Sequence, residues 1–248
     1  MSMHDSAIML RRNFKHTIRN PISVFNAILF PVILMLMFVY VLGDAFSVGE
    51  HYVDYATPGM ILLAICYGLS ATAVGANSDM TKGIINRFKV MDVSRGAVLT
   101  GQVIASMVNN VIAVAAIVGT AYALGFRPSA GLLDWLGVAG LVLLLGFAIG
   151  WFTVALGLFA KSPETAGLGV VPLIMLPFFS SAIVPADKMG AGVKQFAEYQ
   201  PFTPIIETFR GLLAGAPHTG DVIAALAWCA GIAIVGYLWA TATFTKRA

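Results

Sequence analysis

The sequence predicts an all-α integral membrane protein with six membrane-spanning helices. Of its 248 residues, 58% are hydrophobic and only 11% are charged, whereas an ordinary soluble domain carries roughly 25% charged residues. The charged residues are also unevenly placed, because six long stretches contain none of them. A soluble chain of this composition would expose large apolar patches, so the class that fits is a protein surrounded by lipid.

Each charge-free stretch is long enough to form one span. The stretches run from 22 to 31 residues, and a helix needs about 20 residues to cross the hydrocarbon core of a bilayer. They comprise residues 20–43, 55–78, 96–126, 135–160, 165–186 and 222–245. The whole chain, 1–248, is therefore predicted to be one transmembrane domain, with its six spans between residues 21 and 245.

The basic residues predict the orientation of these spans. If both ends of the chain lie on one side, eleven of the fifteen Lys and Arg residues share that side. The eleven are Arg11, Arg12, Lys15, Arg19, Lys82, Arg87, Lys89, Arg95, Lys161, Lys246 and Arg247, and the other four are Arg127, Lys188, Lys194 and Arg210. Cytoplasmic loops carry an excess of Lys and Arg, so we expect both termini to be cytoplasmic. The expected location of the protein is the cytoplasmic membrane. The orientation of the spans accounts for the basic residues, and no stacking aromatic residues accompany them. Both observations argue against nucleic-acid binding.

Residues 1–20 are predicted to form an interfacial helix. On a helical wheel, one face is apolar and a different face carries Arg12, Lys15 and Arg19. The apolar face consists of Met3, Ala7, Leu10, Phe14 and Ile18. Such a helix lies at the level of the lipid headgroups, with its cations toward anionic lipid. A disordered basic tail is the alternative.

The segment 79–95 follows the second span on the cytoplasmic side. Within it Ile84, Ile85, Phe88 and Met91 recur at helical spacing, which predicts a short amphipathic helix. An ordinary solvated loop is the alternative.

Polar residues of the third span share one helical face. Gln102, Ser106 and Asn109 are spaced i, i+4 and i+7, with Asn110 beside them. They could line a translocation path, or they could form hydrogen bonds between packed helices at about 0.6 kcal/mol each.

The C-terminal half contains a kinked span and an external segment. Pro172 and Pro177 predict the kink in the fifth span, and residues 187–221 are too charged to form another simple span. Apolar runs within 187–221 predict short helices that dip into the outer leaflet. Glu207 and Arg210 are spaced i, i+3, so they could form a structural clamp or gate the exit.

The sequence also lacks the motifs of several functional classes. It has no G-x-x-x-x-G-K-[ST] loop for ATP phosphates, no G-x-S-x-G elbow and no H-E-x-x-H pair. Cys66 and Cys229 fall inside charge-free stretches, so a disulfide framework has no support, and the four histidines match no metal-ligand spacing. We therefore expect no catalytic residue, no metal and no cofactor bound by this chain. Since the spans also lack carboxylates for an ion relay, energy for uphill transport would come from another polypeptide.

Several short motifs give the chain a resemblance to a known family. The first three are Arg19-Asn20-Pro21 with Pro31, Tyr55-Ala56-Thr57-Pro58-Gly59-Met60, and Asp79 through Phe88 with Val93-Ser94-Arg95 and Gly101. The others are Ser162-Pro163-Glu164, Phe179-Ser180-Ser181-Ala182 with Val184-Pro185, and Gln200-Pro201-Phe202-Thr203-Pro204 up to Arg210. In this order and spacing they resemble the ABC type-2 export permeases, particularly the daunorubicin-resistance-like membrane subunits of actinobacteria. The resemblance covers nearly the whole chain, with Gln200-Pro201 standing where the family usually has Asn-Pro.

The resemblance implies a function and a set of partners. It implies a permease subunit, paired with a second permease subunit and docked on two cytoplasmic ATPase subunits that bind ATP and Mg²⁺. It also implies that the segment 79–95 contacts those ATPases, through Lys82, Gly83, Ile84, Ile85, Arg87, Phe88 and Met91. The expected cargo is a hydrophobic or amphipathic compound such as a drug or secondary metabolite. A lipid-linked glycan or cell-wall lipid is an alternative cargo, and an ion-coupled carrier or a membrane scaffold is an alternative class.

Overall fold

A computed structural model describes residues 21–43, 52–81, 95–185 and 189–247. Throughout these ranges the regular structure is helical and contains no strand. The helices are α2 (Pro21–Met37), η1 (Phe38–Leu42), α3 (Tyr52–Tyr67), α4 (Leu69–Thr81), α6 (Arg95–Ala123), α7 (Leu132–Phe159), α8 (Pro163–Gly169), α9 (Val171–Met175), η2 (Leu176–Phe179), α10 (Ala191–Tyr199), α11 (Phe202–Leu213) and α12 (Thr219–Arg247). The expected all-α fold is thus confirmed, whereas the predicted interfacial helix of residues 1–20 lies outside the described ranges.

Four helical runs in the described ranges are long and apolar enough to cross a membrane. They are Tyr52–Thr81, which joins α3 to α4, Leu99–Ala123 of α6, Leu132–Phe159 of α7 and Thr219–Thr245 of α12. The first and fifth charge-free stretches form the shorter apolar helices Leu29–Val41 and Pro163–Phe179. Helix length and composition therefore establish four candidate spans in the described part of the chain. The first predicted span is a continuous helical run from Pro21 to Leu42, through α2 and η1, and the fifth is divided into short helices.

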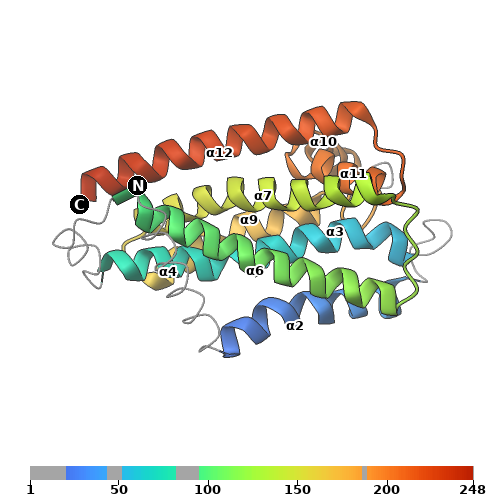
Figure 1. Ribbon diagram of the computed structural model, residues 1–248, viewed down its shortest axis with the longest axis horizontal. Helices are drawn as coiled ribbons and strands as arrows, with labels where there is room; N and C mark the ends of the chain where they lie inside the picture. Colours follow the sequence, from blue (N-terminus) through green and yellow to red (C-terminus); the bar gives the residue numbers. More distant parts are fainter. Residues whose placement is uncertain (1–20, 44–51, 82–94, 186–188, 248) are drawn as a thin grey trace.

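The long helices form an elongated bundle with α7 at its centre. Helix α7 packs against α12, α4 and α6, and Figure 1 shows these helices running along the long axis of the molecule. Glycines allow the closest approaches, since a Cβ at Gly157 of α7 would lie only 3.1 Å from Ala73 Cα of α4. On the α12 side, Trp151 of α7 packs edge-on against Tyr237, with 5.0 Å between ring centroids.

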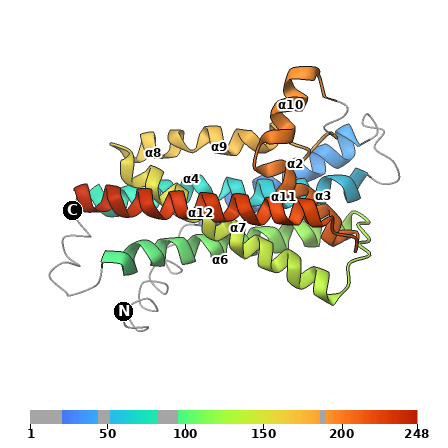
Figure 2. The same ribbon diagram turned by 90° about the horizontal axis from the view of Figure 1, so that it is seen from above.

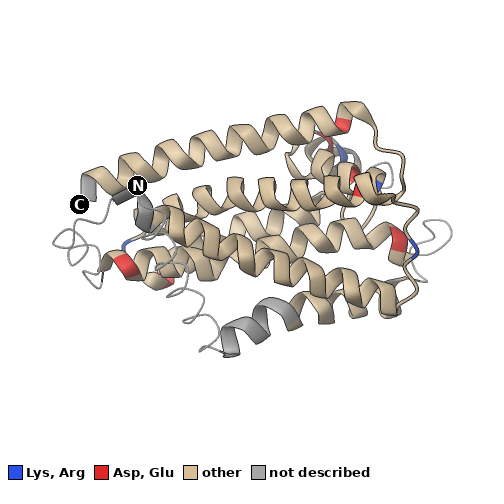
Figure 3. Cartoon of the chain, in the orientation of Figure 1, with Lys and Arg blue, Asp and Glu red and all other residues tan. Residues whose placement is uncertain are grey.

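The charged side chains gather at the two ends of this bundle. Figure 3 shows the coloured Lys, Arg, Asp and Glu residues near the ends of the long axis, while the middle of the described helices is free of them. Asp54, Asp134 and Asp221 lie near the starts of α3, α7 and α12, and Figure 1 places these starts at one end. We call this the Arg210 end. An apolar middle between charged ends is the distribution that a bilayer requires.

The fifth charge-free stretch is kinked, as the prolines predicted. Ser162 caps the start of α8 by accepting a hydrogen bond from the Thr165 backbone N–H at 3.3 Å, and its side chain holds the pKa of Glu164 below its usual range, with a backbone hydrogen bond of Glu164 itself as a further cause. Pro172 lies in the first turn of α9, and Pro177 lies in the first turn of η2. The helix is therefore divided into three short pieces, which Figure 2 shows along one edge of the bundle.

Two short helices, α10 and α11, lie in the segment 187–221, as expected. Helix α11 packs against α12, α3 and α7, and it buries Phe202 and Phe209 completely. Helix α10 lies farther from the bundle axis, at the Arg210 end (Figure 2). The boundary between the second span and the segment 79–95 differs slightly from the prediction. The segment was expected to begin at Asp79, whereas α4 continues to Thr81. The Thr81 hydroxyl supports this last turn by donating to the Asn77 carbonyl oxygen at 3.1 Å.

Candidate functional site

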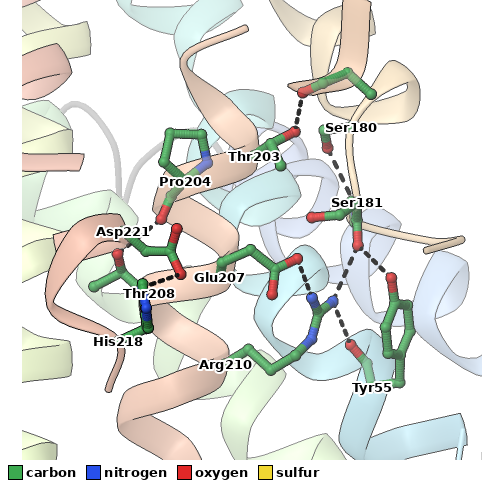
Figure 4. A network of polar contacts seen from close by, with 12 residues as sticks. Tyr55, Ser180, Ser181, Thr203, Pro204, Glu207, Thr208, Arg210, His218 and Asp221 are labelled. Carbon is green, nitrogen blue, oxygen red and sulfur yellow. Dashed lines mark hydrogen bonds and ion pairs between the residues drawn. The ribbon is translucent and has the colours of Figure 1, made fainter. Parts of the chain in front are cut away.

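A cluster of polar contacts joins three segments at the Arg210 end of the bundle. Arg210 of α11 forms an ion pair with Glu207, and its Nη2 donates to the carbonyl oxygens of Ser181 at 3.0 Å and Tyr55 at 3.3 Å. The guanidinium carbon of Arg210 also lies 4.0 Å from the centroid of the Tyr55 ring. Figure 4 shows the guanidinium between Glu207, Ser181 and Tyr55. We refer to these four residues as the Arg210 cluster.

The backbone of residues 179–183, which begins at the last residue of η2, is held by side chains from other elements. The Tyr55 hydroxyl donates to the Ser181 carbonyl oxygen at 2.9 Å, and Gln200 Nε2 donates to the Phe179 carbonyl oxygen at 2.6 Å. A third donor, the Tyr52 hydroxyl, lies 3.4 Å from the Ile183 carbonyl oxygen. Non-helical backbone in a membrane protein needs such partners, because lipid supplies no hydrogen bonds.

Helix α3 can approach this segment because Gly59 has no side chain. A Cβ at Gly59 would lie 2.7 Å from Ala182 Cα, which is closer than such atoms pack. The motifs around Tyr55, Ser181 and Gln200 are far apart in the sequence, and the structure brings them together in one place.

The Arg210 cluster also contains polar atoms that no described residue satisfies. Arg210 Nε and Ser181 Oγ are buried without a hydrogen-bond partner in the described ranges, and the same is true of Asp54 Oδ1 and Gln200 Oε1, which lie outside the cluster. A buried polar atom without a partner costs about 1–3 kcal/mol. By contrast, the Arg210 and Glu207 side chains keep 22% and 32% of their surface exposed, so their ion pair can separate without leaving an isolated charge in the core. This geometry is compatible with both of the roles expected for Glu207 and Arg210, a structural clamp and an exit gate.

The polar residues of α6 lie against glycines of neighbouring helices. A Cβ at Gly75 of α4 would lie 2.5 Å from Gln102 Nε2, and one at Gly150 of α7 would lie 3.5 Å from Ser106 Oγ. Asn110 lies beside two further glycines. A Cβ at Gly68 would lie 2.9 Å from Asn110 Oδ1, and a Cβ at Gly146 would lie 3.3 Å from Asn110 Nδ2. Small residues of this kind let helices approach closely in membranes.

Two of these α6 side chains are almost completely buried. Ser106 is 5% exposed and Asn110 is 3% exposed, and neither Ser106 Oγ nor Asn110 Nδ2 has a hydrogen-bond partner among the described residues. Asn109 is half-buried. In this structure Ser106 and Asn110 thus lie between helices rather than along an open channel.

The predicted ATPase-contacting residues all lie outside the described ranges. They are Lys82, Gly83, Ile84, Ile85, Arg87, Phe88 and Met91, between the end of α4 at Thr81 and the start of α6 at Arg95. Their helix and their role stay predictions.

Sequence reasoning did not identify Asn77 as a functional or structural residue. Its Nδ2 donates to the Gly157 carbonyl oxygen at 3.0 Å and to the Ala160 carbonyl oxygen at 2.8 Å. The last carbonyls of a helix lack partners within that helix, so Asn77 of α4 caps the end of α7. The sequence signal that could have indicated this cap is an amide residue near the end of a charge-free stretch.

Comparison with known proteins gives a consistent family. The ABC-2 type transporter family model matches residues 6–214. The chain is 30% identical over 224 residues to the "Daunorubicin resistance ABC transporter permease protein DrrB1" of Streptomyces coeruleorubidus, covering 90% of this chain and 78% of that protein. It is 29% identical over 220 residues to the "Probable doxorubicin resistance ABC transporter permease protein DrrC" of Mycobacterium tuberculosis, covering 88% of this chain and 79% of that one. Both relatives therefore align along most of their length.

The family match agrees with the helical bundle and with its apolar middle. It covers all three segments that meet in the Arg210 cluster, since Tyr55, Ser181 and Arg210 all lie within residues 6–214. The resemblance inferred from the motifs is confirmed, and the chain belongs to the ABC-2 type transporter family as a membrane-spanning permease subunit.

Proposed function

We propose that this chain is the permease subunit of an ATP-driven exporter that moves a hydrophobic or amphipathic compound out across the cytoplasmic membrane. The observation that carries the proposal is the alignment with a daunorubicin resistance permease over 90% of the chain. The charge-free middle of the bundle supports it (Figure 3), because an ion-coupled carrier usually needs ionisable side chains within its spans. The apolar surfaces of the helices suit a cargo that partitions into lipid.

The energy for this transport would come from partner subunits. The proposed assembly contains two permease subunits and two cytoplasmic ATPases that bind ATP and Mg²⁺. The segment 79–95 would contact the ATPases, with Ile84, Ile85, Phe88 and Met91 as apolar anchors in a groove of the partner. Lys82, Arg87 and Lys89 would favour docking against an acidic rim of that groove.

The proposed topology has six spans with both termini in the cytoplasm. Its support is the eleven-to-four distribution of basic residues. The Arg210 end, with α10 and α11, then faces the outside. A reporter fused after Ala248 should be cytoplasmic, and one inserted at residues 190–192 should be external. An external C-terminus would overturn the six-span topology.

In this topology the Arg210 cluster closes the external end of the bundle. We assign it primarily a clamping role, since Arg210 joins α11 to α3 and to the segment 179–183 at once. For the α6 residues Gln102, Ser106, Asn109 and Asn110 we favour helix packing, because Ser106 and Asn110 are buried against glycines.

Co-purification tests the proposed division of labour. The permease, extracted in mild detergent, should retain an ATPase subunit that contains a phosphate-binding loop, and the complex should hydrolyse ATP faster when an amphipathic cargo is added. Isolation of the permease without any ATPase, from cells that express both, would argue for a carrier or scaffold instead.

A further inference from the structure

An apolar groove lies between the kinked fifth stretch and α10. Its volume is about 490 Å³. It is lined by Pro172, Met175, Leu176, Phe179, Gly192, Val193 and Phe196. Phe179 and Phe196 meet edge to face with 6.4 Å between their ring centroids, and both are about half exposed. This lining offers a ligand no charged or polar side chain and suits a hydrocarbon.

Helix α10 presents this groove and a charged face side by side. Val193 and Phe196 line the groove, whereas Lys194 and Glu198 form an ion pair on the exposed side of the same helix. Tyr199, at the end of α10, is 81% exposed. Amphipathic helices with exposed aromatic residues at their ends typically lie at the membrane interface, so the groove would open into the acyl-chain region next to it.

The size of the groove and the adjacent charge indicate the occupant. The groove volume of about 490 Å³ is far larger than the share of one water molecule, about 30 Å³, so the groove has room for a stretch of acyl chain. Lys194 Nζ lies 3.8 Å from Glu198 Oε1, and the two side chains are 43% and 49% exposed. Because exposed ion pairs of this kind contribute little to stability, the Lys194 ammonium can exchange Glu198 for a lipid phosphate at low cost.

We propose that this groove binds one acyl chain of an anionic phospholipid, whose phosphate lies at Lys194. In the topology proposed above, that lipid belongs to the outer leaflet. The chain would fill the space between η2 and α10 and hold the two together. Gln200 directly follows α10 and donates to the Phe179 carbonyl oxygen, so the bound lipid would also stabilise the segment on which the Arg210 cluster acts.

The groove offers a matched pair of variants. A Cβ at Gly192, which lines the groove, meets no atom within 4 Å, and the same is true of Gly190, which does not line it. Gly192→Leu should therefore fill the groove without a clash, whereas Gly190→Leu adds the same side chain outside it. Equal thermal stability of the two variants and the wild type would establish that the fold is intact.

Photolabelling tests the proposal directly. The full-length protein is reconstituted in nanodiscs with phosphatidylglycerol that carries a photoactivatable diazirine in one acyl chain, and the labelled peptides are identified by mass spectrometry. Labelling should concentrate in residues 172–179 and 192–196. In Gly192→Leu, a leucine excludes several methylenes, so labelling there should fall about tenfold, while Gly190→Leu should match the wild type.

A second arm tests the headgroup. Lys194→Gln should reduce labelling by phosphatidylglycerol to the level obtained with phosphatidylcholine carrying the same chain, and it should leave phosphatidylcholine labelling unchanged. Equal labelling of Gly192→Leu and wild type, or labels spread along the exposed face of α12 without enrichment in the groove, would overturn the proposal. Loss of a permease dimer in Gly192→Leu without any groove labelling would show that a second copy of the chain occupies the site. These measurements need neither cargo nor ATPase, so their outcome is independent of the proposed export function.

Discussion

Arg210 Nη2 donates to the carbonyl oxygen of Ser181 at 3.0 Å and so ties α11 to a non-helical segment 29 residues earlier in the chain. The same nitrogen also reaches the Tyr55 carbonyl oxygen in α3. One guanidinium therefore joins three elements at this end of the bundle (Figure 4).

Arg210→Ala should destabilise the protein by about 2–3 kcal/mol, because it removes charged donors from two carbonyls and leaves Glu207 without its partner. Arg210→Lys should give a smaller loss, since a single ammonium cannot reproduce the fork of a guanidinium. Thermal unfolding in detergent measures both effects. The control is Lys194→Ala, which breaks an exposed ion pair and should cost below about 1 kcal/mol.

The clamp and gate roles of Arg210 give different results in the same variants. If the cluster is a clamp, transport should fall in proportion to the loss of folded protein. Normal thermal stability of Arg210→Ala, combined with a leak of cargo or ATP hydrolysis without transport, would contradict the clamp and establish a gate.

Gly59→Ala should be poorly tolerated, because the new Cβ would overlap the Ala182 backbone, which cannot move aside as a flexible side chain could. Overpacking of this kind typically costs about 1–3 kcal/mol. Gly119→Ala in α6 is the matched control, since a Cβ there meets nothing within 4 Å, and an alanine in a helix is more favourable than glycine. The yield of folded, monodisperse protein after size-exclusion chromatography compares the two. Equal yields would mean that α3 and the segment 179–183 are not in close contact.

Ser106 distinguishes helix packing from a transport path in α6. Ser106→Ala should leave both thermal stability and transport near wild type. The Ser106 hydroxyl has no hydrogen-bond partner in the described structure, so its removal breaks no hydrogen bond and removes only the cost of burying a polar group. Ser106→Leu should destabilise the protein by about 1–3 kcal/mol through overpacking against Gly150. A slower transport rate in Ser106→Ala at unchanged stability would instead place this residue on the path.

Phe88→Ala and Ile85→Asp test the segment 79–95, which lies outside the described ranges. Removing a buried aromatic anchor from an interface commonly costs about 2 kcal/mol or more, so both variants should insert normally into the membrane yet lose the ATPase partner. Lys89→Gln is a milder control, since it changes one charge on the opposite side of the predicted wheel. Co-purification of the ATPase measures the effect. Undiminished ATPase binding and cargo-stimulated hydrolysis in both variants would mean that another part of the chain couples the subunits.

The features that could be predicted from the sequence depend on local composition. The absence of charge between residues 96 and 126 corresponds to the long helix α6, and Pro172 and Pro177 mark the breaks in the fifth stretch. The distribution of charge predicts the spans because an ionised side chain in hydrocarbon is costly, whichever helices the span packs against.

The contacts of the candidate site depend on packing and could not be predicted. Arg210 and Glu207 could be paired from their i, i+3 spacing, but the acceptors at Ser181 and Tyr55 are backbone carbonyls, which every residue type carries. The close approach of Gly59 to Ala182, and the capping of α7 by Asn77, likewise join segments whose proximity exists only in the folded bundle. The motif residues were visible in the sequence, whereas their meeting point was not.

The most direct test of ATP-driven export is transport into inside-out membrane vesicles that contain the permease and its ATPase partner. With ATP supplied, the vesicles should accumulate a fluorescent amphipathic compound, and a protonophore should leave this accumulation intact while vanadate abolishes it. Vesicles that carry an ATPase inactive in hydrolysis should show no accumulation. If the protonophore abolishes uptake while ATP stays high, and the inactive ATPase has no effect, the chain is an ion-coupled carrier and the proposed function is wrong.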